Sequence, residues 1–256
     1  MFKKNVKINW NYSSLAKFYD LRADYSPNLI KKILLITKCK KYYPVADIGA
    51  GTGKLTKLLC SSGLIVNAVE PNKNMRLYGK QNTKIFDNLN WSTGSGEVTG
   101  LKDKSVYFVF FGSSFNTVNY KKASAEIKRI VIKNGYFCCM WNHRNLNNDH
   151  QKNIEKIILK KIPDYNYGDR RIDYKNILKK LRIFTNIKKI SQRFHVKISK
   201  KDFINGWKSH ATLKKNCSSQ RQFDDIIRLI TNYISSIKGK YINVPYDNVA
   251  YVAKLK

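Results

Sequence analysis

Acidic side chains are scarce in this chain of 256 residues, which has 17 Asp and Glu against 49 Lys and Arg and a formal net charge of +32. Glutamate occurs only at positions 70, 97, 126 and 155. A surface with this charge attracts phosphates and other polyanions. Lysine, asparagine and isoleucine are all abundant, however, and the basic residues stand in scattered pairs, so a bias in composition also explains the charge.

The sequence also lacks motifs for metal binding and disulfide bonding. Its five cysteines are odd in number and show no CxxC spacing, which argues against a zinc site or a disulfide framework. Its four histidines lack ligand-like spacing with cysteine or carboxylate residues. We therefore expect reduced thiols and no metal.

Long apolar runs are missing, although hydrophobic residues make up 43% of the chain, enough for a core. No run approaches the roughly 20 residues that a membrane span needs. The first residues, MFKKNVKINWNYSS, are basic but lack the apolar stretch of a secretory signal. We expect a soluble, cytoplasmic protein without a membrane partner.

Short apolar runs alternate with segments of helical periodicity in the first 142 residues. Buried strands are predicted over 44–48, 64–69, 90–93, 106–111 and 136–141. Helices are predicted over 29–37, 54–62, 72–79 and 123–132, the last ended by Asn134-Gly135. This alternation predicts an α/β fold with a Rossmann-like, doubly wound parallel sheet.

The pattern becomes mostly helical after Asn142. Helices are predicted over 151–161, 174–181, 201–210 and 222–237, and strands over 187–198 and 249–255, for a total of seven strands. We interpret 1–40 as an N-terminal lid with helices and 41–142 as the ligand-binding core. The remainder, 143–256, is interpreted as a helical cap inserted over the ligand edge, together with the closing strands of the sheet.

The segment from Asp47 to Gly53 points most directly to a ligand. Glycines at alternate positions after a strand let the backbone approach a ligand closely, and they leave free N–H groups where a helix opens at Lys54. The spacing is GxGxG rather than the GxGxxG of dinucleotide folds. An acidic residue two positions before the first glycine completes a pattern typical of methyltransferases. An ordinary glycine-rich turn and a nicotinamide site are the alternatives.

Two further segments follow strands at the same edge. Glu70 ends the second predicted strand, where a carboxylate can accept both hydroxyls of a ribose. Ser95, Gly96 and Glu97 follow the third, where a side-chain oxygen and a backbone N–H could read an adenine edge. The alternatives are an exposed carboxylate at the strand end and a flexible glycine loop.

The stretch from 47 to 141 resembles the type-11 branch of class I S-adenosylmethionine-dependent methyltransferases, especially the trans-aconitate-methyltransferase-like group. The opening motif YDxRPxYP is matched at 19–26, the loop AE-x-TGL at 96–101, and E-x-x-R-V-L-K-P-G-G with its later W-N at 126–135 and 141–142. The family's closing V-x-x-PY motif corresponds in part to Val244-Pro245-Tyr246. The family's aromatic-His-Trp run is replaced by Phe115-Asn116-Thr117, and its usual Asp by Tyr107, so the substrate does not carry over.

The resemblance implies S-adenosylmethionine as cofactor. The predicted cofactor-binding residues are Tyr19, Arg22, Tyr25, Asp47, Gly49, Ala50, Gly51, Gly53, Glu70, Pro71, Met75, Ser95, Gly96, Glu97, Gly112 and Ser113, of which Tyr19, Arg22 and Tyr25 would form a lid. The predicted substrate-binding residues are Phe115, Asn116, Trp141 and Tyr246. His143 could serve as a base for a hydroxyl acceptor, although a structural role remains open.

Three functions follow from these observations. The first is methyl transfer to an oxygen, nitrogen or carboxylate on a small molecule, which a cap could enclose. The second is methylation of RNA or another polyanion, which the basic charge favours. The sequence contains neither an NPPY-type motif nor a Pro-Cys pair, and both absences count against this second function. The third is a non-catalytic S-adenosylmethionine-binding protein. The oligomeric state is left open.

Overall fold

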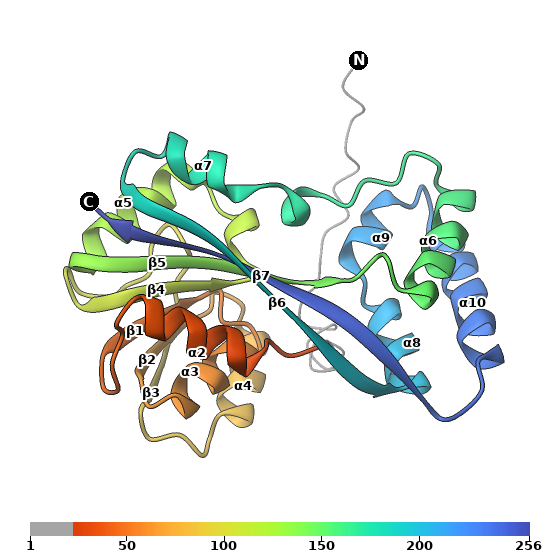
Figure 1. The fold of residues 1–256 in the computed structure, drawn as a ribbon, viewed down its shortest axis with the longest axis horizontal. Helices are drawn as coiled ribbons and strands as arrows, with labels where there is room; N and C mark the ends of the chain where they lie inside the picture. Colours follow the sequence, from red (N-terminus) through yellow and green to blue (C-terminus); the bar gives the residue numbers. More distant parts are fainter. Residues whose placement is uncertain (1–22) are drawn as a thin grey trace.

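The computed structural model describes residues 23–256, and a seven-stranded sheet lies at its centre (Figure 1). The strands are β1 (Pro44–Ile48), β2 (Ile65–Val69), β3 (Leu89–Ser92), β4 (Val106–Gly112), β5 (Val131–Arg144), β6 (Phe184–Ser199) and β7 (Tyr241–Leu255), in the order β3-β2-β1-β4-β5-β7-β6. The first five run parallel to one another, whereas β7 is antiparallel to both of its neighbours. The predicted α/β fold is confirmed.

Helices cover both faces of the sheet. They are α2 (Pro27–Ile36), α3 (Lys54–Ser61), α4 (Lys73–Asn82), α5 (Tyr120–Ile130), α6 (Asp149–Lys161), α7 (Tyr174–Lys180), α8 (Lys200–Lys208), α9 (Ala211–Asn216) and α10 (Gln220–Ser236). One buried cluster joins the sheet to α5 and α7, and a second joins it to α2 and α3. In β4, Phe108 and Phe110 enter the second cluster while Val109 and Phe111 enter the first, as the two-residue period of a strand requires.

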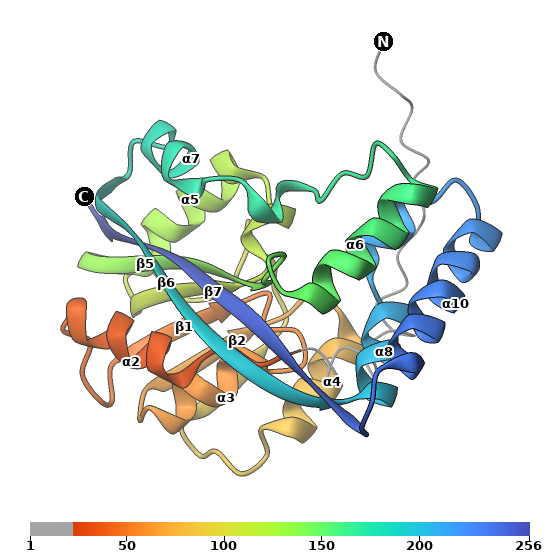
Figure 2. The same cartoon turned by 45° about the vertical axis from the view of Figure 1, so that its right-hand side comes forward.

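The last two strands extend far beyond the core. β6 and β7 pair over almost their whole length and cross from the sheet to a second lobe (Figures 1 and 2). There α6, α8, α9 and α10 enclose a third buried cluster, which includes Ile154, Phe203, Trp207, Ile226 and Val244. We call these four helices the cap.

Three local predictions differ from the structure. α5 ends at Ile130 and β5 begins at once, so Asn134-Gly135 does not stop the helix but lies at an irregularity of β5, where the pairing register shifts between Val106 and Phe108. Asn134 has a φ of 64° there. A β-carbon on Gly135 would lie 2.5 Å from the Val131 side chain, so the glycine permits the close turn. The predicted strand 187–198 extends to Phe184–Ser199 as β6, the predicted strand 249–255 is the last part of the longer β7, and the six-residue α9 is an unpredicted helix.

The five cysteines are free and buried. Within residues 23–256, no helix is both long enough and apolar enough to cross a membrane.

Candidate active site at the carboxyl edge of the sheet

Glycines shape the loop that follows β1. Gly49, Gly51 and Gly53 have φ angles of 69°, 60° and 84°, a region that costs other residues roughly 1–2 kcal/mol. A β-carbon on Gly49 would lie 2.6 Å from the Ser114 β-carbon, and one on Gly53 would lie 2.9 Å from Thr83. The alternate glycines therefore let the loop turn tightly into α3 and keep its backbone open at the edge of the sheet.

Glu70 fastens this loop to the end of β2. Its Oε2 atom accepts a hydrogen bond from the Gly51 backbone N–H at 2.9 Å, and its Oε1 atom accepts one from the Asn72 N–H at 2.9 Å. The residue is only 7% exposed, and burial raises its pKa against the effect of these two bonds. Because a carboxylate has about four acceptor positions, two remain for the hydroxyls of a ligand.

Asp47 lies at the centre of the site and is fully buried. Its Oδ2 atom accepts a hydrogen bond from the Thr56 hydroxyl at 2.7 Å. Its Oδ1 atom has no hydrogen-bond partner among the described residues. Burial raises the pKa of Asp47 to about 7, helped by the nearby Glu70 carboxylate. An unsatisfied buried acceptor is costly, so this atom marks a place where a ligand donor would be stabilising.

Residues 23–26 pass over the same edge and are tied to it by polar contacts. The Tyr25 hydroxyl is 2.8 Å from the Ser113 hydroxyl. The Asn142 side chain donates to the Asp24 carbonyl at 2.8 Å and accepts from the Asn248 amide at 2.5 Å. This part of the predicted lid is thus held by residues at the ends of β4 and β5. Tyr19 and Arg22, also predicted for the lid, lie outside the described residues.

A cavity of about 410 Å³ lies between this edge and the cap. Most of the predicted cofactor residues line it, namely Tyr25, Asp47, Gly49, Ala50, Gly51, Glu70, Pro71, Met75, Gly112 and Ser113. His143 and Tyr246 line it as well, whereas Gly53 caps α3. The volume falls within the range of about 300–1,000 Å³ that is typical of ligand sites.

Besides Gly53, six predicted residues lie outside the cavity wall. Ser95 and Gly96 are two of them, and Ser95 accepts hydrogen bonds from the backbone of its own loop. The Glu97 carboxylate accepts from the Asn119 N–H at 2.8 Å instead of facing the cavity. Phe115 and Trp141 are fully buried in the core, and the Trp141 indole donates to Asn116 at 3.0 Å. These three predicted substrate residues therefore do not line the cavity.

Several residues of the cavity wall were not predicted, including Arg144, Glu155, Arg171 and Trp207. They come from β5, α6, the 3-10 turn η2 (Asp169–Arg171) and α8, and no local motif joins them. Arg144 directly follows the predicted His143. A predicted strand that continued three residues past Trp141 would therefore have included Arg144.

The sequence of this chain is similar to those of known proteins. Residues 46–139 match the sequence profile of a methyltransferase domain family. An uncharacterised methyltransferase of Schizosaccharomyces pombe is 28% identical over 134 residues, and one of Mycobacterium bovis is 31% identical over 137 residues. Each match covers 52% of this chain and 52% of the relative, so the chain spans about half the length of these relatives.

Solved structures share the fold over most of the chain. A protein of Anaeromyxobacter dehalogenans, described as a type II methyltransferase, aligns with a TM-score of 0.67 at 12% identity over 91% of this chain and 97% of its own. Phosphoethanolamine N-methyltransferase 2 of Haemonchus contortus, solved with phosphomonomethylethanolamine and S-adenosylhomocysteine, aligns with a TM-score of 0.55 at 16% identity, over 95% of this chain and 57% of its own.

Residues 46–139 match a methyltransferase domain, and the relatives and the shared fold support a class I S-adenosylmethionine-dependent methyltransferase core. The residues at this edge of the sheet fit S-adenosylmethionine chemically. Glu70 retains acceptor positions for ribose hydroxyls, the glycine loop leaves the backbone accessible, and the Asp47 Oδ1 atom lacks a donor within the described part of the chain. The trans-aconitate-like subgroup stays a prediction.

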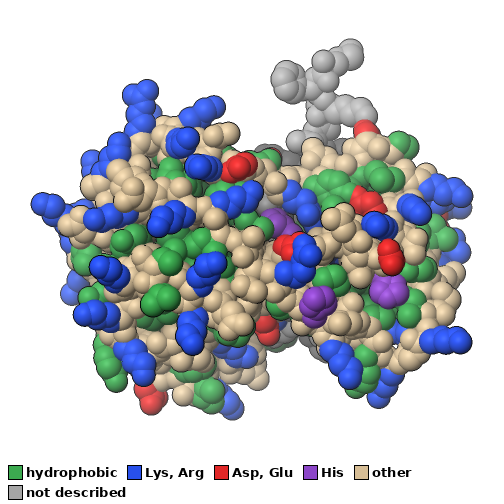
Figure 3. Space-filling view, in the orientation of Figure 1, with side chains coloured by type: hydrophobic (Ala, Val, Ile, Leu, Met, Phe, Trp, Pro, Cys, Tyr) green, Lys and Arg blue, Asp and Glu red, His purple; other side chains and the backbone are tan. Residues whose placement is uncertain are grey.

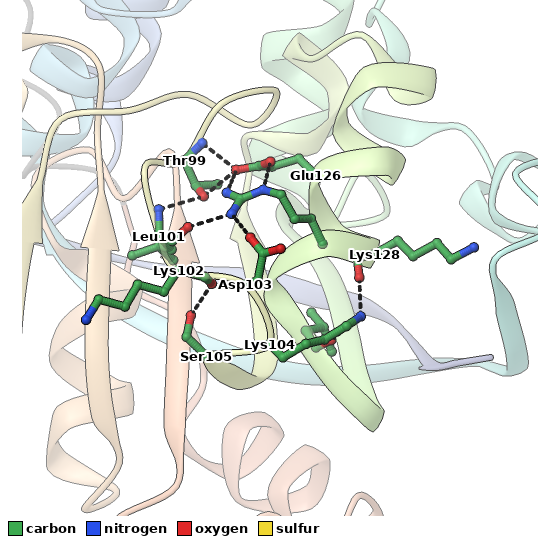
Figure 4. A network of polar contacts seen from close by, with 10 residues as sticks. Thr99, Leu101, Lys102, Asp103, Lys104, Ser105, Glu126 and Lys128 are labelled. Carbon is green, nitrogen blue, oxygen red and sulfur yellow. Dashed lines mark hydrogen bonds and ion pairs between the residues drawn. The ribbon is translucent and has the colours of Figure 1, made fainter.

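A second network secures the loop between β3 and β4 of the methyltransferase core (Figure 4). The Glu126 carboxylate accepts from the Thr99 N–H at 2.8 Å and hydroxyl at 2.5 Å. Arg129 donates to both Glu126 oxygens, to the Leu101 carbonyl at 2.8 Å and to Asp103 at 2.6 Å. Arg129 lowers the pKa of Glu126 to about 2. The E-x-x-R motif therefore ties residues 99–103 to α5.

Proposed function

We propose that the chain transfers a methyl group from S-adenosylmethionine to an oxygen, nitrogen or carboxylate of a small molecule held between the sheet edge and the cap. One observation carries the proposal: a single cavity is lined both by the glycine loop with Glu70 and by the cap helices α6 and α8. A cavity shared in this way can hold a methyl donor and an acceptor together. The proposal includes action in the cytoplasm.

The cofactor, when bound, supplies a reactive sulfonium methyl group. The chain's own residues have to align the acceptor with that group and exclude water. Glu70 and the glycine loop would hold the donor, while residues 23–26 and the cap cover the cavity. A hydroxyl acceptor must lose a proton, and we propose His143, which lines the cavity from β5, to accept it.

Small acceptors are favoured over a polyanion. The Haemonchus neighbour is in complex with phosphomonomethylethanolamine, a small molecule with one phosphate. The net charge of +32 supports RNA or another polyanion as the second candidate. On the face in Figure 3, however, Lys and Arg side chains are spread over both lobes, without gathering into one stripe. A dispersed charge supports general attraction better than a defined nucleic-acid groove.

Calorimetry with S-adenosylmethionine and S-adenosylhomocysteine tests the cofactor site directly. We expect wild-type binding with a Kd on the order of micromolar. Glu70→Ala removes the ribose acceptor, and Gly51→Arg adds a side chain at a φ of 60°, so both variants should weaken binding by about 100-fold or more.

Asp225→Asn is the matched control, because it removes an exposed carboxylate on α10 that pairs with Arg228 and does not line the cavity. It should bind like the wild type. A folded wild-type protein that binds neither ligand would refute the proposed function.

A further inference from the structure

Buried polar side-chain atoms without a hydrogen-bond partner gather around the cavity. Within residues 23–256, these atoms are Asp47 Oδ1, Thr52 Oγ1, Ser92 Oγ, Gln151 Nε2 and Trp207 Nε1. All of these residues except Ser92 line the cavity. Buried polar atoms are paired throughout most of a folded protein, because an unmade hydrogen bond is costly. Their concentration around one cavity therefore indicates that a ligand supplies the missing partners.

The unpaired atoms on the cap side are both N–H donors. Gln151 Nε2 comes from α6 and Trp207 Nε1 from α8, and the two residues are only 2% and 4% exposed. The nitrogen of an indole and the nitrogen of a side-chain amide donate hydrogen bonds and do not accept them. Asp47 Oδ1, by contrast, is an acceptor and belongs to the edge of the sheet that we assign to the methyl donor. A ligand group that pairs with the cap must therefore accept hydrogen bonds.

The start of α6 does not use the side chain of Gln151. A glutamine at the third position of a helix can bond to the backbone N–H of the capping residue. Here the capping residue is Asn148, and its N–H donates to the Asn145 carbonyl at 3.2 Å instead. The Gln151 backbone N–H donates to the Asn148 side chain at 3.3 Å, so only the backbone of Gln151 takes part in the cap of the helix. Its side-chain amide is left to an occupant of the cavity.

A glycine widens the cavity at α8. Gly206 lies inside this helix and lines the cavity. A β-carbon built on it would have no described atom within 4 Å, and its backbone is not in the left-handed region. Glycine is unfavourable inside a helix compared with alanine. Since neither crowding nor backbone conformation requires a glycine here, its effect is to leave room for a ligand.

The surface around this room is apolar. Phe203 lies one turn before Gly206 on α8, and Ile154 and Ile158 follow Gln151 by three and seven residues on one face of α6. These three side chains are at most 3% exposed and line the cavity. An occupant made only of polar groups would leave this surface without partners, whereas an apolar body would cover it.

We propose that the methyl acceptor has an apolar body and a carbonyl oxygen. The oxygen accepts a hydrogen bond from the Gln151 amide, and the body lies over Gly206 against Phe203. A carbonyl suits a wall of donors, because it has two acceptor positions and no proton that would itself need a partner. This inference rests on the proposed function for the role of the occupant as a methyl acceptor.

Calorimetry on the full chain, with and without saturating S-adenosylhomocysteine, tests the site with three probes. Acetophenone carries a carbonyl on an apolar ring, ethylbenzene has a similar shape without the oxygen, and acetone has the carbonyl without the ring. Acetophenone should bind about tenfold or more tightly than either of the others, because it alone makes both the hydrogen bond and the apolar contact.

The variant Gln151→Met assigns the hydrogen bond. Methionine has a similar size but no N–H, so the variant should bind acetophenone about tenfold more weakly and ethylbenzene unchanged. Its Tm should not fall, because the substitution removes a buried donor that has no partner in the described chain. Gln220→Met is the matched control, since this exposed amide on α10 pairs with Asp224 outside the cavity, and it should alter neither Kd.

The variant Gly206→Leu assigns the apolar body. The leucine side chain occupies the space beside α8, so acetophenone and ethylbenzene should both bind about tenfold or more weakly. The Tm should stay the same or rise, because leucine favours a helix more than glycine does. Binding of S-adenosylhomocysteine should be unchanged, which separates lost space from lost folding.

The outcomes distinguish this inference from the proposed function. No binding of acetophenone, equal binding of ethylbenzene or acetone, or an unchanged Kd for acetophenone in Gln151→Met would overturn it. Unchanged binding of both aromatic probes by a folded Gly206→Leu protein would overturn the placement of the apolar body. Binding of acetophenone that depends on Gln151, in a chain that does not bind S-adenosylhomocysteine, would keep the carbonyl site and reject the methyltransferase activity.

Discussion

A single buried carboxyl group, that of Asp47, couples the site to pH. The residue is fully buried, and its Oδ1 atom has no partner within the described residues. Burial raises its pKa from 3.8 to about 7, even though the Thr56 hydroxyl donates to its other oxygen. The protonated form is therefore favoured in the folded chain well above the pH at which an exposed Asp ionises.

This shift predicts that Asp47 lowers stability as the pH rises. Below about pH 3.8 the group is protonated in both states and carries no penalty, whereas above about pH 7 the folded chain must hold a buried anion. Each pKa unit corresponds to about 1.36 kcal/mol, so the penalty is up to about 4 kcal/mol. Asp47→Asn cannot ionise and avoids it.

Urea unfolding of the wild type and Asp47→Asn across this pH range measures the effect. Other titrating groups cancel in the difference between the two proteins. The free energy of unfolding of the wild type should fall relative to the variant between about pH 4 and pH 8. A difference that stays constant over the range would show that Asp47 does not titrate as its burial requires.

At the scale of elements, the Glu126–Arg129 network joins α5 to the loop before β4. Glu126→Gln should lower the free energy of unfolding by about 1–3 kcal/mol, because it weakens charge-assisted bonds to Arg129 and to the Thr99 N–H. Asp103→Asn should cost under about 1 kcal/mol, since its ion pair is exposed. Chemical denaturation at neutral pH compares the two variants.

The same network has a pH dependence of opposite sign to that of Asp47. The pKa of Glu126 is lowered from 4.5 to about 2, so its stabilising effect is complete above about pH 4.5 and is lost as the pH falls toward 2. The advantage of the wild type over Glu126→Gln should shrink in that window. An advantage that persists at about pH 2 would contradict the assignment.

Elements with a local signal could be predicted from the sequence. β1, β2 and β4 are short and mostly apolar runs, and the glycine loop after β1 needs positive φ angles that its own residues supply. β6 alternates in exposure from Ile190 to Ile198 and was predicted over most of its length, whereas the alternation of β7 is interrupted at Val244-Pro245 and its first eight residues were not predicted. α9 has six residues and depends on capping by His210, which propensity alone does not reveal.

The residues of the candidate site also divide into those with a local sequence signal and those without one. Asp47 and Glu70 stand in one continuous motif and at one strand end, so spacing identified them. Arg144, Arg171 and Trp207 come from three separate segments, and only the folding of the cap over the sheet edge brings them together. Trp141 and Phe115 were assigned to the substrate because they follow strands at the correct edge, yet their side chains point into the core.

At the scale of the whole molecule, the charge of +32 opposes the compact state. The basic side chains are spread over both lobes on the face in Figure 3, and the ion pairs recorded between described residues are few beside 49 Lys and Arg. Long-range repulsion between the basic side chains is therefore uncompensated over much of the surface. The same positive potential is what supports the hypothesis of a polyanionic substrate.

Screening this repulsion should stabilise the fold. The Debye length falls from about 30 Å at 0.01 M to about 10 Å at 0.1 M salt, a change that removes most interactions between separated surface charges. We expect the Tm to rise over this range of sodium chloride concentration and then to level off. A charge-reduced variant carrying Lys31→Gln, Lys32→Gln, Lys201→Gln and Lys215→Gln, all exposed, should start from a higher Tm and respond less. A Tm that stays flat or falls with salt would show that net repulsion does not limit the stability of the fold. The positive charges would then be compensated by local pairing with nearby groups.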